Sequence, residues 1–388
     1  MRGDVGIISG QTNNQDAGLG CRIVRTSNGT LYKFYTDIVT DIFWIKSTDG
    51  GISWTAPALI NANNCGVIGV WYDQWTPGDS GGVIHLGYID TTAHDILYNS
   101  LNTANDTLSG DVQVFNGASL GTNQNSCLSI TKSVGGNLYI GFDGDGGTET
   151  GFYRSTDSGA TWGSRSNVLD GAADYFILLP GNYADNQDID CIYWDRTADE
   201  ISLKVYDDSG DSWAETSIAT SMVDIGHNVF CGHFSALVRP SDSHILMCAW
   251  ENRDTATAKL RAWDINGAAS ITELTNVVSS STDDQTGCTL CLDSNNTIYV
   301  AYCGKTDGSE TVGTAEGIYY KRSTDGGTTW SSETTLSSNL RDHVLLNSAP
   351  FHDGEPLIEF GVETSTVLDM WLVKQFNVQT VFMNGAFN

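Results

Sequence analysis

The strongest constraint on the fold is a ladder of seven short apolar runs, each rich in aromatic residues and each preceded by turn residues. They begin at Leu31, Ile84, Leu138, Asp190, Leu246, Ile298 and Leu357, in steps of 53, 54, 52, 56, 52 and 59 residues. A period near 54 built from short alternating strands is typical of propeller blades, which bury their faces only by stacking on one another. We therefore predict an all-β chain that forms a single β-propeller, with seven four-stranded blades favoured and six as the alternative.

The order of strands within each repeat is also predicted. An inner strand A is followed by a tight turn, the ladder strand B, a loop, a strand C and an outer strand D. The N-terminal segment 1–10 alternates like a strand but has no blade of its own, so we expect it to complete the last blade and close the ring. The propeller then spans residues 1–376, and residues 377–388 are a C-terminal tail.

A second repeat supports the first. The segment STDGGISW at Ser47–Trp54 returns as STDSGATW at Ser155–Trp162 and STDGGTTW at Ser323–Trp330, and YDDSGDSW at Tyr206–Trp213 is a degenerate copy. We expect each Asp to accept hydrogen bonds from backbone N–H groups of its turn, each Gly to supply a positive φ, and each Trp to pack into the sheet. The four copies are therefore predicted C-to-D hairpins, with these structural residues: Asp49, Trp54, Asp157, Trp162, Asp208, Trp213, Asp325 and Trp330.

With these turns the sequence resembles the Asp-box (BNR-repeat) propellers of the sialidase-like, or neuraminidase, superfamily. The resemblance covers nearly the whole chain as architecture and includes Arg22-Ile23-Val24, which is similar to the Arg-Ile-Pro motif of sialidases. It implies that Arg22 belongs to an arginine cluster that grips a substrate carboxylate. It also implies that the Asp boxes lie on the face opposite to the functional site.

The expected site therefore lies among the D-to-A and B-to-C connections. Asp37 and Asp41, in the first B-to-C loop, are the candidates for a catalytic acid/base. The candidate ligand-binding residues are Arg22, Arg253, Arg341, Arg196, His227, His343 and Trp250. Sialidases use a Tyr nucleophile with a partner Glu, and neither the sixth nor the seventh inner strand offers a Tyr at that position.

Two further sets of residues recur in the same register. Tyr35, Tyr88, Phe142, Trp194, Trp250 and Tyr302 fall near the end of successive B strands, where they either stack on sugars or pack between blades. Cys21, Cys65, Cys127, Cys231 and Cys288 begin inner strands, where small buried side chains are expected. Packing is the interpretation that needs no ligand.

Composition narrows the partners. The chain has 47 Asp+Glu against 19 Lys+Arg, a formal net charge of -28, so its surface repels nucleic acid and anionic membranes. Nine cysteines, an odd number, are expected to be mostly reduced and buried. No cofactor is expected. The acidic turn Asp143–Gly147 is an alternative site for calcium, although it lacks the ligand spacing of an EF-hand.

Three functions remain open. The first is a carbohydrate-recognising propeller without hydrolase activity, exposed on a virion or cell surface, with a glycan and other surface proteins as partners. The second is an exo-sialidase-type glycoside hydrolase or another polysaccharide-active enzyme. The third is a purely structural assembly protein. Neither a signal peptide nor an 18-residue apolar span is visible, so we expect no membrane insertion, with a virion-surface or extracellular place favoured and a cytoplasmic one as the alternative.

Overall fold

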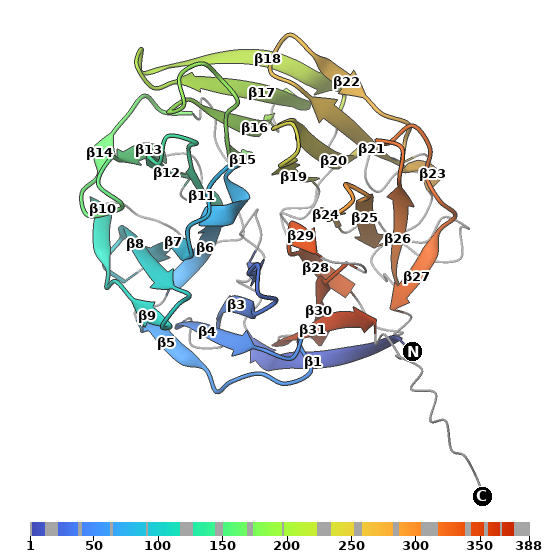
Figure 1. The fold of residues 1–388 in the computed structure, drawn as a ribbon, viewed down its shortest axis with the longest axis horizontal. Helices are drawn as coiled ribbons and strands as arrows, with labels where there is room; N and C mark the ends of the chain where they lie inside the picture. The colour runs from blue at the N-terminus through green and yellow to red at the C-terminus, as the bar shows by residue number, and fades with distance from the viewer. Residues whose placement is uncertain are drawn as a thin grey trace, which may run out of the picture.

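The fold is described by a computed structural model. It describes residues 2–11, 22–37, 41–62, 65–90, 92–116, 127–143, 150–168, 174–195, 198–222, 234–251, 258–281, 287–303, 317–337, 343–352, 356–364 and 367–375. Within these ranges the strands form seven sheets arranged around a ring, antiparallel except for one parallel pair in sheet 6 (Figure 1). The chain is a single all-β propeller.

The first three sheets follow one another along the chain. Sheet 1 contains β2 (Ile23–Arg25), β3 (Leu31–Thr36), β4 (Ile42–Ser47) and β5 (Ala58–Asn61). Sheet 2 contains β6 (Cys65–Tyr72), β7 (Val83–Asp90), β8 (Asp95–Asn102), β9 (Thr107–Leu108) and β10 (Val112–Asn116). Sheet 3 contains β11 (Cys127–Lys132), β12 (Leu138–Asp143), β13 (Thr150–Ser155) and β14 (Gly163–Ser164).

The next three sheets repeat this order. Sheet 4 contains β15 (Tyr175–Pro180), β16 (Ile189–Asp195), β17 (Glu200–Asp207) and β18 (Ser212–Thr220). Sheet 5 contains β19 (Phe234–Val238), β20 (Ile245–Glu251), β21 (Ala258–Ile265), β22 (Ile271–Glu273) and β23 (Val278–Ser281). Sheet 6 contains β24 (Cys288–Asp293), β25 (Ile298–Cys303), β26 (Ile318–Ser323), β27 (Thr334–Ser337) and β29 (Phe351–His352).

Sheet 7 joins the two ends of the chain. It contains β28 (His343–Ser348), β30 (Ile358–Thr364), β31 (Val367–Gln375) and the N-terminal strand β1 (Arg2–Gln11). Strand β1 pairs with β31 antiparallel, from Arg2 opposite Gln375 to Gln11 opposite Leu368. The segment expected to close the ring is therefore the outer strand of the last sheet. The predicted tail lies outside the described residues.

Strand burial follows position in the ring. Strands β3, β12, β15 and β25 are buried along their whole length, whereas the outer strand β18 is mostly exposed. The inner and second strands are covered on both faces by neighbouring sheets, which is why they read as nearly continuous apolar runs. The seven cysteines that the structure describes are all buried, and none of them forms a disulfide: Cys65, Cys127, Cys191, Cys248, Cys288, Cys291 and Cys303.

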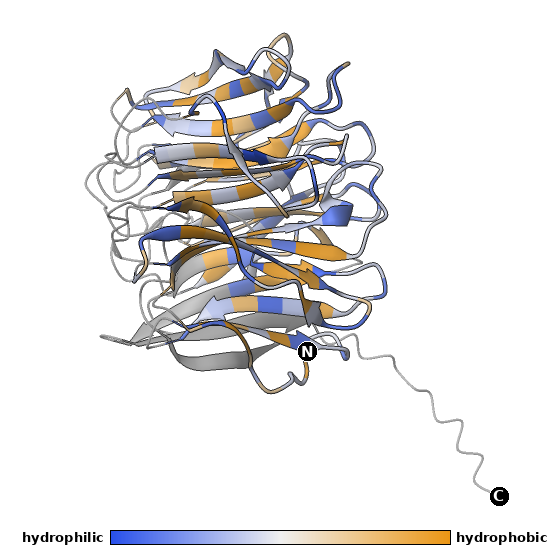
Figure 2. Ribbon diagram, turned by 90° about the vertical axis from the view of Figure 1, so that its left-hand side faces the viewer, coloured by the Kyte–Doolittle hydropathy of each residue, from blue (hydrophilic) through white to orange (hydrophobic). Residues whose placement is uncertain are grey.

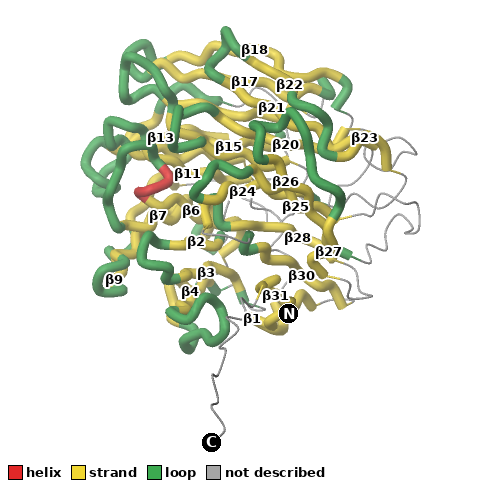
Figure 3. The backbone as a smooth tube through the Cα atoms, turned by 45° about the vertical axis from the view of Figure 1, so that its right-hand side comes forward, coloured by secondary structure: helices red, strands yellow, loops and turns green. Residues whose placement is uncertain are grey.

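Each sheet presents its turns to one of two faces of the ring. The A-to-B and C-to-D turns lie together on one face, which we call the turn face, and the inner strands begin on the opposite one, the loop face. In the side view the described turns project from the right-hand side (Figure 2). The single helical segment among the described residues, η2 (Asp73–Trp75), is part of the A-to-B connection of sheet 2 (Figure 3).

The three complete STDxGxxW copies fold as self-capped turns. In the second copy the backbone N–H of Thr161 donates to Asp157 Oδ1 at 2.8 Å, and the backbone N–H of Gly159 donates to Ser155 Oγ at 2.9 Å. Gly159 has φ 91°, which an L side chain rarely adopts. Hydrogen bonds from the Thr161 hydroxyl, the Thr161 backbone N–H and the Ser155 hydroxyl lower the pKa of Asp157 to about 2. Asp49 and Asp325 accept equivalent bonds from Ser53 and Thr329.

The fourth copy departs from the prediction. Asp208 was expected to cap its own turn, but Asp207 does so instead, accepting hydrogen bonds from Gly210 N and Ser209 Oγ, both at 2.8 Å. Asp208 accepts both of its 2.7 Å hydrogen bonds from Arg154, in sheet 3. The reason is that β17 runs to Asp207 and a four-residue turn follows, so Asp208 points at the neighbouring sheet.

The four box tryptophans also do more than fill their own sheets. All four are half-buried, and each contacts the sheet that precedes it. Trp162 lies 5.3 Å from the ring of Tyr98 in sheet 2, and Trp213 donates from Nε1 to Ser166 O beside sheet 3 at 2.9 Å. Trp330 donates to Thr275 O of sheet 5 at 2.7 Å, and Trp54 packs in a cluster with Ala349 of sheet 7. The repeated Trp therefore joins neighbouring sheets.

Candidate functional site

Three of the predicted site residues lie at the loop end of sheet 1. Arg22 directly precedes β2 and is 7% exposed, and its carbonyl accepts a hydrogen bond from Phe34 N. Asp37 follows β3 and is tied to Asp41, because Asp41 N donates to Asp37 Oδ1 and Asp37 N donates to Asp41 O, both at 2.9 Å. Burial, followed by the charge of Asp37, raises the pKa of Tyr35 to about 12. The structure thus brings Arg22, Asp37 and Asp41 to one end of one sheet.

Most of the remaining predicted ligand-binding residues lie outside the described part of the chain. These are Arg196, His227, Arg253 and Arg341, together with the side chain of His343. Trp250 is 1% exposed, and its Nε1 donates to Gly287 O at 3.2 Å. Its ring packs edge-on against Tyr302 at 6.0 Å, between sheets 5 and 6. Trp250 is therefore placed as a packing residue.

The other members of the predicted aromatic set are placed in the same way. Each is at most 3% exposed: Tyr35, Tyr88, Phe142, Trp194 and Tyr302. Burial of this degree leaves no ring face on which a sugar could stack. The structure favours packing over ligand contact for the whole set.

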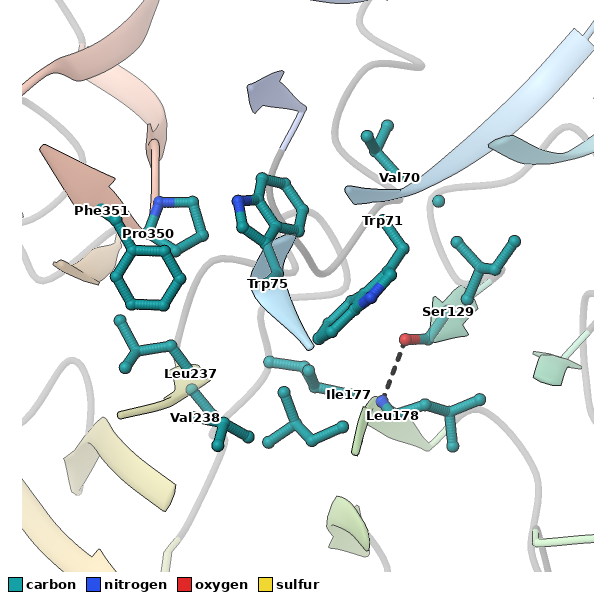
Figure 4. Close-up of a pocket in the computed structure, with 14 residues that line it drawn as sticks. Val70, Trp71, Trp75, Ser129, Ile177, Leu178, Leu237, Val238, Pro350 and Phe351 are labelled. Carbon is teal, nitrogen blue, oxygen red and sulfur yellow. Dashed lines mark hydrogen bonds between the residues drawn. The ribbon is translucent and has the colours of Figure 1, made fainter. Parts of the chain in front are cut away.

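An apolar pocket lies on the axis of the ring. It is small, with a volume of about 40 Å³, and is lined by inner strands of sheets 2 to 5 and by Pro350 and Phe351 (Figure 4). Trp71 and Trp75 meet edge-on there at 5.6 Å. Ser129 Oγ accepts a hydrogen bond from Leu178 N, so the one hydroxyl among the lining residues is already used. The interior offers no charged group for chemistry.

A buried polar network positions Trp75. Asp73 Oδ1 lies 3.0 Å from His85 Nε2 and 2.6 Å from Lys132 Nζ, while His85 Nδ1 lies 2.8 Å from Tyr98 Oη. Burial of Asp73 opposes its ionisation, but the hydrogen bonds from His85 and Lys132 outweigh it and lower its pKa to about 2. The network anchors η2 to sheet 3, and η2 carries Trp75 to the axis.

A second, polar pocket opens around the axis on the turn face. It holds about 420 Å³ and is lined by Arg25, Pro240, Ser241, Leu292, Asp293, Ser294, Asn296, Phe351 and His352. These residues come from the inner turns of sheets 1, 5 and 6 and from β29. Phe351 lines both pockets and so forms the boundary between the apolar interior and the polar mouth.

Phe351 reaches the axis because of an unusual pairing. Strand β29 lies in the A-to-B connection of sheet 7 but pairs parallel with β24 of sheet 6, with Phe351 opposite Leu292 and His352 opposite Asp293. Leu292 N also donates to Pro350 O at 2.9 Å. Sequence reasoning missed this pocket, because no repeated residue pattern marks the parallel pairing that places β29.

Within the described residues, no group of three or more His, Cys, Asp or Glu is arranged to hold a metal ion. Asp143 is buried, and the rest of the acidic turn considered for calcium lies outside the described residues. Among the described residues, no helix is long and apolar enough to cross a membrane.

No protein-family model matches the chain, and no curated protein matches it in sequence. A polysaccharide lyase of family PL25, an ulvan lyase, is similar in structure, with 13% identity, 96% of each chain covered and a TM-score of 0.57. AofleA from Arthrobotrys oligospora matches at 14% identity over 87% of this chain and 90% of its own, with a TM-score of 0.50. The Aleuria aurantia lectin matches at 11% identity over 95% and 96%, with a TM-score of 0.47. At these identities the likeness to the first two shows the β-propeller fold.

Proposed function

We propose that the protein is a carbohydrate-recognising propeller of the Asp-box, sialidase-like type, in which each of the seven sheets is one blade. Three turns with the same Ser, Asp and Gly hydrogen bonds support the Asp-box assignment. Seven ladder strands coincide with the second strands of seven sheets, which supports seven blades over six. The ulvan lyase with the similar fold was also solved bound to -[GlcA(1-4)Rha3S]-, which supports a glycan as ligand.

The observation that carries the proposal is the gathering of Arg22, Asp37 and Asp41 at the loop end of sheet 1. A guanidinium forms two parallel hydrogen bonds with a carboxylate and is preferred wherever that recognition matters. A nearly buried Arg22 at the start of an inner strand therefore suits the carboxylate of an acidic sugar. In this proposal Arg196, Arg253, Arg341, His227 and His343 complete the binding surface on the loop face, and Asp37 or Asp41 contacts the glycosidic oxygen.

Recognition without hydrolysis is the form of the proposal that the described residues support best. The loop end of sheet 1 carries two carboxyl groups, those of Asp37 and Asp41. Asp37 Oδ1 already accepts a hydrogen bond from Asp41 N, and Asp37 N donates to the backbone carbonyl of Asp41. The only tyrosine beside them that the structure describes, Tyr35, is 3% exposed, and its raised pKa disfavours the phenolate that a nucleophile requires.

The place of the protein is part of the same proposal. We place it on the outside of a virion or cell, where a glycan ligand is met. A polar surface with many Asn, Thr, Ser and Gly residues, and described cysteines that are buried and in no disulfide, suit a protein that folds in a reducing compartment and is exposed later. Antibody labelling of intact particles tests this, and labelling that appears only after lysis contradicts it.

The function is tested by screening the protein on a glycan array that includes sialylated and uronate-containing glycans, followed by titration calorimetry of the ligands found. Arg22→Ala should weaken binding at least tenfold. Arg322→Ala, which removes an exposed arginine from the turn face, is the matched charge control and should bind normally. A blank array sinks the proposal, and Arg22-dependent turnover of a fluorogenic sialoside would make the protein a hydrolase instead.

A further inference from the structure

We infer that the polar pocket on the turn face is a second ligand site, which binds a single neutral pyranose ring. It is separate from the loop-face site proposed above and does not depend on it. Its volume of about 420 Å³ falls within the range of roughly 300 to 1,000 Å³ that small-molecule sites occupy.

The chemistry of the lining selects the class of ligand. Arg25 and Asp293 bring opposite charges to one pocket, so an anion gains from the first and is repelled by the second, and a cation meets the reverse. Ser241, Ser294 and Asn296 supply hydroxyl and amide groups that both donate and accept hydrogen bonds. A neutral ligand that carries several hydroxyl groups matches this set.

Phe351 supplies the remaining element. Its ring is half-buried at the boundary with the apolar interior, so one face of a ligand in the pocket meets an apolar surface. A pyranose has hydroxyl groups around its edge and an apolar C–H face, which is the combination that an aromatic floor with a polar wall accommodates. A flat aromatic ligand would make none of the hydrogen bonds that the hydroxyl and amide groups of this wall offer.

The wall is held rigid before any ligand arrives. In sheet 6, Asn295 N and Thr297 N both donate to Asp293 Oδ1 at 2.8 Å, which fixes the turn after β24. In sheet 5, Arg239 fixes the turn that carries Pro240 and Ser241, through Asp242 at 2.6 Å and Asp264 at 2.8 Å. Preorganised walls reduce the entropy cost of binding.

The sheet 1 side of the pocket is equally constrained. Asn28 Oδ1 accepts hydrogen bonds from Thr26 Oγ1 at 2.6 Å and from Thr30 N at 3.1 Å, which closes the turn after Arg25. Turns from three sheets thus converge on one opening, and β29 holds Phe351 beneath them. A single sugar ring in a half-open pocket should bind with a dissociation constant of roughly 0.1 to 10 mM.

The test is saturation-transfer NMR on the whole protein with D-glucose, D-galactose, D-mannose, L-fucose, L-rhamnose, N-acetyl-D-glucosamine and D-glucuronate, each followed by titration. We expect at least one neutral sugar to bind and D-glucuronate to bind more weakly than D-glucose. Ser241→Trp fills the pocket from an exposed turn position and should weaken binding at least tenfold. Val134→Trp, at the corresponding turn of sheet 3 and outside the pocket, should not change it.

Two further variants keep the two sites apart. Phe351→Leu keeps an apolar side chain but removes the ring face, and should weaken binding three- to tenfold in a protein that thermal unfolding shows to be folded. Arg22→Ala should leave this site intact. The inference is overturned if no sugar gives a transfer signal, or if Ser241→Trp binds every sugar as the unaltered protein does. Binding that is lost in Arg22→Ala and kept in Ser241→Trp leaves the proposed function standing and removes only the second site.

Discussion

Lys33 and Glu359 form an ion pair in which both side chains are fully buried, although 326 positions of the chain separate them. Lys33 lies in β3 of sheet 1 and Glu359 in β30 of sheet 7, so the pair crosses the junction at which the ring closes. Glu359 Oε2 has no hydrogen-bond partner among the described residues. The closure is therefore made by a charge pair that is only partly satisfied, in addition to the pairing of β1 with β31.

Removing one partner of this pair should be costly. Glu359→Leu leaves an uncompensated buried ammonium, and we expect it to lower the free energy of unfolding by about 3 to 5 kcal/mol. The double variant Lys33→Met with Glu359→Leu should recover most of that loss, because two apolar side chains replace two desolvated charges. Urea denaturation of both single variants and the double variant measures the coupling, and additive losses would contradict a direct interaction.

The STDxGxxW turns should tolerate no side chain at the glycine of their fifth position. A Cβ at Gly159 would lie 2.1 Å from Tyr98 Cε1, and Gly159 has φ 91°. We expect Gly159→Ala to destabilise the protein by about 2 to 4 kcal/mol, from backbone strain together with overpacking. Gly163→Ala, where no atom lies within 4 Å of the added Cβ, is the control and should change the midpoint of thermal unfolding little.

The altered fourth turn predicts a coupling between sheets 3 and 4. Asp208 accepts hydrogen bonds from Arg154 and from Tyr139 Oη, the latter at 3.0 Å. Asp208→Ala should therefore cost about 1 to 2 kcal/mol of stability, and its effect should largely vanish in an Arg154→Ala background. If Asp208 instead capped its own turn, the loss would be the same in both backgrounds.

Stability should fall as the pH rises through a window set by Asp190. Burial raises the pKa of Asp190 to about 7. The hydrogen bond that Tyr183 donates to Asp190 acts in the opposite direction and lowers the pKa, but burial outweighs it. The folded protein therefore binds a proton that the unfolded chain has lost between pH 4 and 7, and the free energy of unfolding decreases over that range. Asp190→Asn, which cannot ionise, should gain up to about 4 kcal/mol relative to the original protein between pH 4 and 8.

Chemical denaturation at pH 4, 6 and 8 tests this, with Asp199→Asn as a matched variant on the loop side of the same sheet. The Asp199 variant should follow the original protein at every pH. Parallel curves for Asp190→Asn and the original protein would contradict the assignment of the pH dependence to Asp190.

The architecture was predictable because it repeats. The apolar ladder placed the second strand of every sheet, from Leu31 to Leu357, within about a residue of where it lies. The ring-closing strand was predictable too, since an unpaired alternating segment at one end and a three-stranded sheet at the other complete each other. Repetition averages out the local ambiguity of any single strand.

The features that break the repeat were not predictable. Asp207 rather than Asp208 caps the fourth turn, because β17 ends at Asp207 and the turn follows it. Two adjacent aspartates in a sequence do not reveal which of them caps the turn and which contacts the neighbouring sheet. The pocket on the turn face depends on β29, a two-residue strand that pairs in parallel with another sheet. This pairing joins residues of two different sheets, and no repeated residue pattern in the sequence marks it.

The box tryptophans all point the same way around the ring, and this gives assembly a direction. As the chain is synthesised, Trp162, Trp213 and Trp330 each arrive after the sheet they contact, so each new hairpin docks on a wall that already stands. Trp54 is the exception, because its neighbour Ala349 belongs to the last sheet to be made. Sheet 1 therefore gains this contact only after the whole chain has been synthesised. The last docking step then joins the first and the last sheets of the chain.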